Sequence, residues 1–147
     1  MAVADLLVVS KGDIEEAVKL YRGAIESVDD LRPRYDRTVF LGYIKIGDIL
    51  KSQNDPDGAF KEYNVASSIA RESATRDAAS TTWQRNLEIS YAKIGDLLAA
   101  QGRAREMFDH YREALDFVVK LAAQHPENSR WAALAQSLKT QTDKEER

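Results

Sequence analysis

The feature that most restricts the fold of this chain is an internal repeat with a period of 48 residues. The tetrapeptide Lys-Ile-Gly-Asp at residues 45–48 recurs at residues 93–96, and the same offset brings further identical residues into register. These pairs are Tyr43 and Tyr91, Leu50 and Leu98, Gln53 and Gln101, Phe60 and Phe108, Tyr63 and Tyr111, and Ala66 and Ala114. A fixed period of this kind is typical of proteins that stack one supersecondary unit on the next.

Apolar residues within the repeat follow the spacing of amphipathic helices. From Ala104 to Leu121 they lie at intervals of three, one, three, three, one, three and three residues, and the stretch from Ile14 to Leu31 has the same spacing. Residues three or four apart share one face of a helix. The segment from about Tyr35 to Gln53 carries a similar stripe. The sequence therefore predicts an all-α fold built from pairs of antiparallel helices.

Turn residues separate the two helices of each pair at aligned positions. Asn54 and Gly102 follow first helices, where asparagine and glycine favour the left-handed C-cap conformation. Asp55 is predicted to cap the next helix, and Pro56 to take its first position. The other predicted N-caps are Asp13, Thr81 and Ser129. At the third turn, Arg103 occupies the N-cap position and cannot cap in this way. The residues from Thr140 onward are expected to fray.

The repeat also predicts the domain organisation. A chain of 147 residues is an ordinary length for one domain, so residues 1–147 are interpreted as a single repeat domain. Its repeat units are predicted at about residues 1–34, 35–80 and 81–128, and a C-terminal capping helix at about residues 129–140. The stripe of that helix comprises Trp131, Leu134, Ala135 and Leu138.

The stripe and its glycine resemble the tetratricopeptide repeat. The signature of that family places an aromatic residue before a Leu-Gly pair and, later, an alanine and an aromatic residue on the second helix. One unit matches with Tyr43, Ile46, Gly47, Leu50, Ala59 and Tyr63, and the next with Tyr91, Ile94, Gly95, Leu98, Met107 and Tyr111. The sequence that begins at Trp83 looks like a long-period bacterial form of this repeat. The family's usual period is about 34 residues, and the longer period here predicts second helices of roughly 20 residues.

The resemblance implies a short α-solenoid that acts as a protein–protein interaction scaffold. Such repeats bind a peptide or a partner helix on the concave face formed by the first helices. In the family's peptide-clamp members, basic groups on this face hold a carboxylate. This sequence lacks the matching asparagine, and its aspartates would oppose a carboxylate, so the resemblance implies the binding face and leaves the ligand open.

A repeated charged row is the candidate binding site on that face. Lys45 with Asp48, and Lys93 with Asp96, lie within ion-pairing reach on the predicted first helices. A solvated row of weak surface ion pairs is the alternative interpretation. Apolar residues flank the row at Leu41, Ile44, Ile89 and Ala92, although neighbouring first helices would also bury them.

Composition narrows the other classes of function. The chain has no cysteine, its net charge is −3, and no apolar stretch is long enough to span a bilayer. We therefore expect no nucleic-acid or membrane partner and a cytoplasmic location. His110 and His125 are the two histidines, and both are interpreted as solvated residues without a third metal ligand nearby. No phosphate-binding loop or catalytic constellation is recognisable, so we expect neither a cofactor nor enzymatic activity.

A self-assembly module is the second interpretation of the same pattern. The predicted units leave incomplete helix pairs at both ends, and repeat arrays need polar caps to stay monomeric. The chain would then form a homodimer through its repeat ends, as part of a larger protein.

Overall fold

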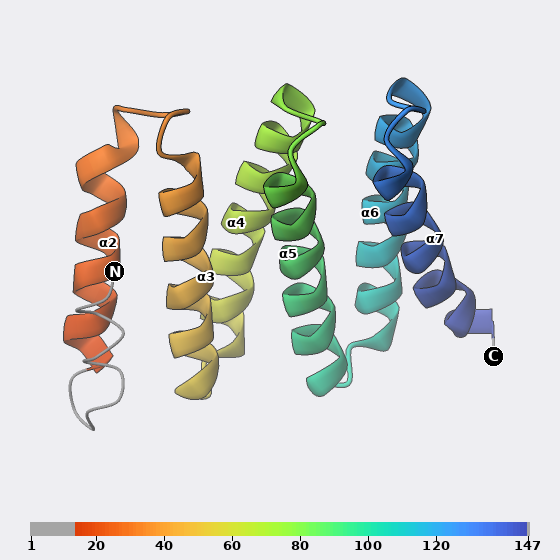
Figure 1. Cartoon of the computed structure of the whole chain (residues 1–147). Coiled ribbons are helices and arrows are strands. Elements are labelled where there is room, and N and C mark those ends of the chain that lie inside the picture. Colours follow the sequence, from red (N-terminus) through yellow and green to blue (C-terminus); the bar gives the residue numbers. More distant parts are fainter. Residues whose placement is uncertain (1–13, 147) are drawn as a thin grey trace. The chain divides into compact units, whose positions relative to one another are not determined.

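The computed structural model describes residues 14–146, and every regular element in this range is helical (Figure 1). The elements are α2 (Ile14–Asp29), α3 (Asp36–Ser52), α4 (Pro56–Arg76), α5 (Thr81–Ala100), α6 (Ala104–Gln124), α7 (Ser129–Asp143) and the short 3-10 helix η1 (Lys144–Glu146). The all-α prediction is thus confirmed for the described range. Packing between consecutive helices fits a helical repeat, as in α2 against α3 and α6 against α7.

The chain divides into two compact units after Ile69, within α4. The N-terminal unit holds α2, α3 and most of α4, and the C-terminal unit holds the end of α4 and the helices that follow. The predictions of one domain over 1–147, and of its repeat boundaries, stay predictions. The predicted cap Asp13 and the first helix of the first repeat lie outside the described residues.

In the N-terminal unit, the predicted stripes form the core. Helix α2 buries Ala17, Tyr21 and Ile25 from the predicted stripe, whereas Leu31 at the end of that stripe is 52% exposed. Ion pairs also lie within this unit. Arg22 on α2 reaches the largely buried Glu62 on α4 at 2.5 Å, and Arg32 reaches the buried Asp36 at 2.5 Å. Buried carboxylates need such partners because an unpaired charge in the interior is costly.

In the C-terminal unit, three helices contribute stripes to one core. Buried residues are Leu87, Tyr91, Ile94 and Leu98 on α5, Tyr111, Ala114, Val118 and Leu121 on α6, and Trp131, Leu134 and Leu138 on α7. The indole of Trp131 is completely buried, and its Nε1 donates a hydrogen bond to the backbone oxygen of Ala78 at 2.9 Å. Its polar atom is therefore satisfied, as a buried indole requires.

The turns within the hairpins follow the predicted chemistry. Asn54 and Gly102 both have positive φ, at 61° and 69°. The amide after each turn residue donates 2.9 Å back to the preceding helix, from Asp55 to the oxygen of Leu50 and from Arg103 to that of Leu98. This is the bond that closes a helix with a left-handed C-cap. The Asp55 side chain accepts from the amide of Gly58 at 3.0 Å, and Arg103 makes no side-chain cap, both as predicted.

Two predictions about helix ends were wrong. The N-caps of α5 and α7 are Ser80, which accepts from the amide of Trp83, and Asn128, which accepts from the amide of Arg130. Thr81 and Ser129 are instead the first helical residues, because the preceding residue in each case also has a capping side chain. The predicted fraying from Thr140 is also wrong, since α7 continues to Asp143.

The predicted length of the second helices is confirmed, since α4 and α6 have 21 residues each.

Candidate functional site

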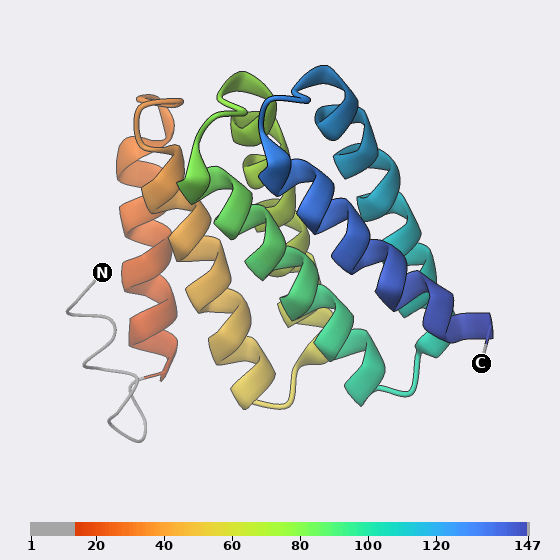
Figure 2. The same ribbon diagram turned by 45° about the vertical axis from the view of Figure 1, so that its right-hand side comes forward.

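A cavity of about 210 Å³ lies between α5 and α7 in the C-terminal unit, and one residue of α6 also lines it. Figure 2 shows α7 running alongside α5. Its floor is apolar and aromatic, and its rim carries one carboxylate, one hydroxyl and one amide. The lining residues are Glu88, Tyr91 and Ala92 from α5, Tyr111 from α6, and Leu134, Ser137, Leu138 and Gln141 from α7.

The side chain of Tyr111 is the most unusual group in this cavity. It is only 8% exposed, yet its hydroxyl makes no hydrogen bond to any residue in the described part of the chain. Gly95 lets the phenol approach α5, because a Cβ atom at that position would overlap the Tyr111 hydroxyl. Burial, together with the negative charge of Asp96, raises the pKa of Tyr111, so the phenol is neutral at ordinary pH.

The equivalent tyrosine of the N-terminal unit is satisfied. The Tyr63 hydroxyl donates to Asp48 Oδ1 at 2.5 Å, and the ring packs against Gly47. Tyr63 is completely buried. Burial is the main cause that raises its pKa, and the hydrogen bond to Asp48 adds to it. The two hairpins therefore share Gly, Asp and Tyr in register but differ in whether the tyrosine hydroxyl is bonded.

Tyr91 also lines the cavity, and a residue that does not line the cavity, Arg71, holds its side chain in place. Its hydroxyl accepts from Arg71 Nε at 3.2 Å, and the guanidinium lies over the rings of Tyr91 and Phe117, at 5.5 and 5.2 Å from their centres. These are cation–π distances. Burial raises the pKa of Tyr91, although the positive charge of Arg71 opposes that shift. This wall is thus held in one position before any ligand arrives.

The interpretation of His110 as a solvated residue was wrong. Its ring packs edge-on against Tyr91, with ring centres 5.6 Å apart, and Nε2 lies 3.2 Å from the backbone oxygen of Tyr91. Because a carbonyl oxygen only accepts, Nε2 must carry the donated proton. Burial lowers the pKa of His110. The residue follows Asp109 and lies off the apolar stripe, so its position along the helix alone did not indicate this packing.

The predicted site residues fall into two sets, one in each compact unit. In the N-terminal unit, Leu41 and Lys45 are exposed, Ile44 is buried in the core, and Asp48 is half-buried beneath the Tyr63 hydroxyl. Asp48 therefore accepts a hydrogen bond within its own hairpin.

In the C-terminal unit, Ile89, Ala92 and Asp96 are exposed, and Lys93 is half-buried. Of these, Ala92 lines the cavity, and Asp96 acts on Tyr111 through its charge. The proposed binding role of all eight residues stays a prediction.

Sequence reasoning missed the residues that give the cavity its character. Tyr111 was assigned to packing, and Glu88, Ser137 and Gln141 were not singled out. A signal for Tyr111 was present, since its repeat partner Tyr63 occupies the same register. The α7 residues gave no such signal, because their approach to α5 depends on how the helices pack.

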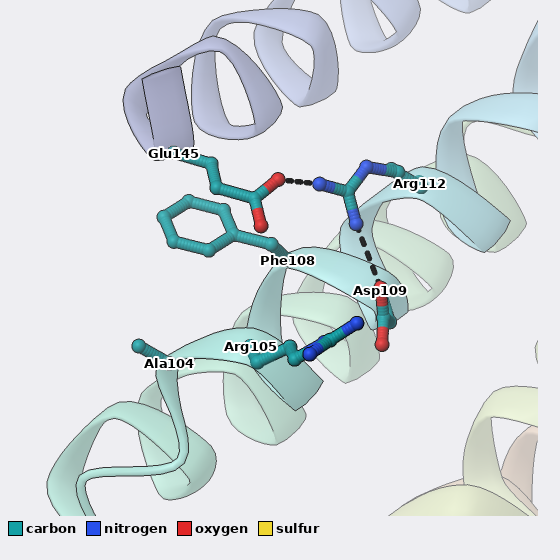
Figure 3. Close-up of a pocket in the computed structure, with 6 residues that line it drawn as sticks. All are labelled: Ala104, Arg105, Phe108, Asp109, Arg112 and Glu145. Carbon is teal, nitrogen blue, oxygen red and sulfur yellow. Dashed lines mark hydrogen bonds and ion pairs between the residues drawn. The ribbon is translucent and has the colours of Figure 1, made fainter. Parts of the chain in front are cut away.

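Two more open hollows flank other parts of the C-terminal unit. Figure 3 shows the first, of about 390 Å³, where Arg112 on α6 lies between Asp109, at 2.7 Å, and Glu145 of η1. The second, of about 450 Å³, lies beside Arg71 and Phe117. Both are surface depressions more open than the cavity between α5 and α7, and the charged groups of each include opposite signs.

Two other classes of site are absent from the described residues. Residues 14–146 contain no group of three or more His, Asp or Glu side chains placed to hold a metal ion. In the same range, no helix combines the length and the apolar character needed to cross a bilayer.

Comparison with known proteins finds no family model, no curated protein and no solved structure that matches the chain. The all-helical architecture therefore stands on the structure itself. The resemblance to the tetratricopeptide repeat rests on the residues in register.

Proposed function

We propose that this chain is a tetratricopeptide-like interaction scaffold whose cavity between α5 and α7 receives a segment of another protein. The observation that carries the proposal is the cavity itself, where the largely buried Tyr111, whose hydroxyl has no hydrogen bond to the described residues, lies beside apolar side chains. A hydroxyl that lines a cavity in this way is available to form a hydrogen bond with a ligand.

The size of the cavity favours a side chain over a free small molecule. Small-molecule sites usually measure about 300–1,000 Å³, whereas this cavity measures about 210 Å³. The floor formed by Ala92, Leu134 and Leu138 suits an apolar stem. Peptide segments that dock on helical grooves bind in this way, with one or two side chains inserted and the rest lying on the surface.

A selection from a random peptide library displayed on phage tests the proposal with the full chain as bait. Binders are then measured by fluorescence anisotropy against two matched variants, Ala92→Trp and Ala99→Trp, which replace exposed alanines of α5. Only Ala92 lines the cavity. We expect Ala92→Trp to weaken binding at least tenfold and Ala99→Trp to leave it unchanged. Equal binding to both variants, or no selected peptide, would contradict the proposal.

Self-assembly is the competing proposal. Exposed apolar side chains include Leu41 and Ile89, at 41% and 37% exposure, and Val119 at 49%. Single exposed apolar residues are normal on a protein surface. Sedimentation velocity over a wide range of concentrations separates the two proposals. A dimer that persists on dilution and that peptides do not dissociate would favour self-assembly, and a monomer would favour the scaffold.

A further inference from the structure

The strongest unexplained feature is the difference between Tyr111 and Tyr63. Each phenol packs against a glycine of the facing helix, and in both hairpins an aspartate directly follows that glycine in the sequence. Tyr63 donates to Asp48 at 2.5 Å. Tyr111 is 8% exposed and lines the cavity, yet among the described residues its hydroxyl has no hydrogen-bond partner. The Tyr111 hydroxyl is therefore open to a hydrogen bond from outside its own hairpin.

We infer that the Tyr111 hydroxyl, Asp96 and Glu88 form a subsite for a positively charged side chain, a lysine ammonium or an arginine guanidinium, of the partner segment. The inference rests on the proposed function, because it assigns the chemistry of the segment that enters the cavity. It names a different class of ligand from the carboxylate that the peptide-clamp relatives hold.

The chemistry of the phenol allows a ligand that donates hydrogen bonds. A tyrosine hydroxyl can accept hydrogen bonds as well as donate one. An ammonium group has three donors and no acceptor, and a guanidinium has five donors. Either group can donate to the Tyr111 oxygen and also to a nearby carboxylate. The cation would then connect Tyr111 with Asp96, a connection that Tyr63 and Asp48 make directly.

Charge around the cavity favours the same ligand. Glu88 is the one charged residue among those lining the cavity in the described part of the chain, and it is exposed at the rim. Asp96 acts on Tyr111 through its negative charge. The cation Arg71 lies outside this wall, and its Nε is bonded to the Tyr91 hydroxyl. Lys93 on the same helix is itself engaged in an interaction. An anionic side chain would therefore meet like charge at the rim, whereas a cation would meet opposite charge.

Below that charged rim, the apolar floor fits the stem of the same side chain. Ala92, Leu134 and Leu138 line the same cavity as Tyr111 and contribute alkyl groups to it. Lysine and arginine bury their methylene stems along apolar surface while their charged heads reach polar groups. A ligand of this shape uses both parts of the cavity, whereas a purely apolar side chain would leave the hydroxyl unsatisfied.

The test is an NMR titration of the full ¹⁵N-labelled chain with side-chain analogues. The probes are n-butylammonium and n-propylguanidinium, with n-butanol as the neutral control and butyrate as the anionic control. We expect both cations to shift amides near Ala92, Tyr111 and Ser137, with the weak affinity usual for so small a ligand. Butanol should bind at least fivefold more weakly, and butyrate should not bind.

Matched variants identify the groups responsible. Tyr111→Phe should weaken butylammonium binding at least fivefold, and Glu88→Gln about two- to threefold, with a smaller dependence on salt. Tyr63→Phe is the control, because it removes the equivalent hydroxyl outside the cavity. Circular dichroism confirms that each variant is folded.

The outcomes separate this inference from the proposed function. Equal binding of butanol and butylammonium, no shift with either cation, or unchanged binding to Tyr111→Phe would overturn the cation subsite. In each of these cases, selected peptides that still lose affinity for Ala92→Trp would leave the interaction scaffold standing. Cation binding that depends on Tyr111, in a chain that selects no peptide, would support the subsite and contradict the scaffold.

Discussion

The α3–α4 and α5–α6 hairpins are two versions of one arrangement. In each, a glycine on the first helix admits the ring of a tyrosine from the second helix, Tyr63 against Gly47 and Tyr111 against Gly95. In the first hairpin the hydroxyl is bonded to Asp48, and in the second it lines the cavity beneath α7. The comparison teaches that the same residues can form a hydrogen bond within one hairpin and leave the tyrosine hydroxyl in a cavity in the other.

A second pair of aligned positions in the two hairpins also makes different contacts. Glu62 on α4 and His110 on α6 are 48 residues apart. Glu62 forms an ion pair with Arg22 of α2, whereas His110 packs on Tyr91 and reaches its backbone oxygen. The N-terminal unit thus uses this position for charge pairing, and the C-terminal unit uses it to brace a wall of the cavity.

Replacing the glycines should give the largest effect and should distinguish the hairpins. Gly47→Leu and Gly95→Leu both place a side chain where a tyrosine ring now lies, and overpacking costs about 1–3 kcal/mol or more. We expect Gly95→Leu to cost less, because the unbonded Tyr111 can move toward the cavity. Urea unfolding measures both free energies. Equal losses would show that the cavity gives Tyr111 no freedom.

Removing the tyrosine hydroxyls should give a smaller effect of the same sign. Tyr63→Phe deletes the donor to the half-buried Asp48 and should cost about 1–2 kcal/mol. Tyr111→Phe removes a hydroxyl that makes no hydrogen bond to the described residues, and should change stability by less than about 0.5 kcal/mol. Thermal and urea unfolding of the two variants check this. A Tyr111→Phe loss as large as that of Tyr63→Phe would mean that both hydroxyls are bonded in the free protein.

The loss of stability at alkaline pH should also differ between the two tyrosines. The folded chain raises the pKa values of Tyr63 and Tyr111. Folding therefore favours the neutral phenols, and the stability that they contribute is present below the unfolded pKa of about 10 and lost as the pH rises above it. Tyr63→Phe should reduce this loss more than Tyr111→Phe, since the hydrogen bond to Asp48 adds to the shift at Tyr63 alone. Urea unfolding at a series of alkaline pH values measures it.

The smallest expected effect is a loss of stability at mildly acidic pH, caused by His110 in the C-terminal unit. Burial lowers the pKa of His110, and Arg71 lowers it further, whereas the bond to Tyr91 and the charge of Glu113 oppose the shift. The folded state therefore favours the neutral ring, so this stability is present above the unfolded pKa of about 6.5 and lost as the pH falls below it. His110→Gln should flatten the pH dependence of unfolding in that range. An unchanged profile would contradict the effect of this half-buried position on the His110 ring.

Much of the fold could be predicted because helices leave a periodic signal. The stripe of α5, from Leu87 to Leu98, and the buried Trp131 were both expected from spacing. The caps at Ser80 and Asn128 were missed by one residue, because each is followed by a second side chain that can cap. For the candidate site, the sequence indicated the helix that carries Ala92 and Asp96, but not the α7 residues opposite Ala92.

The sequence by itself determined the helices and the turns between them, since each depends on residues that are near in the chain or matched by the repeat. Only the tertiary structure decided what becomes of each tyrosine hydroxyl. Gly-Asp and Tyr occur at the same spacing in both hairpins, yet Tyr63 is bonded to Asp48 and Tyr111 lines a cavity completed by Leu134 and Leu138 of α7. A hydrogen bond is made or lost within a few tenths of an ångström, and that precision is set by how neighbouring helices pack.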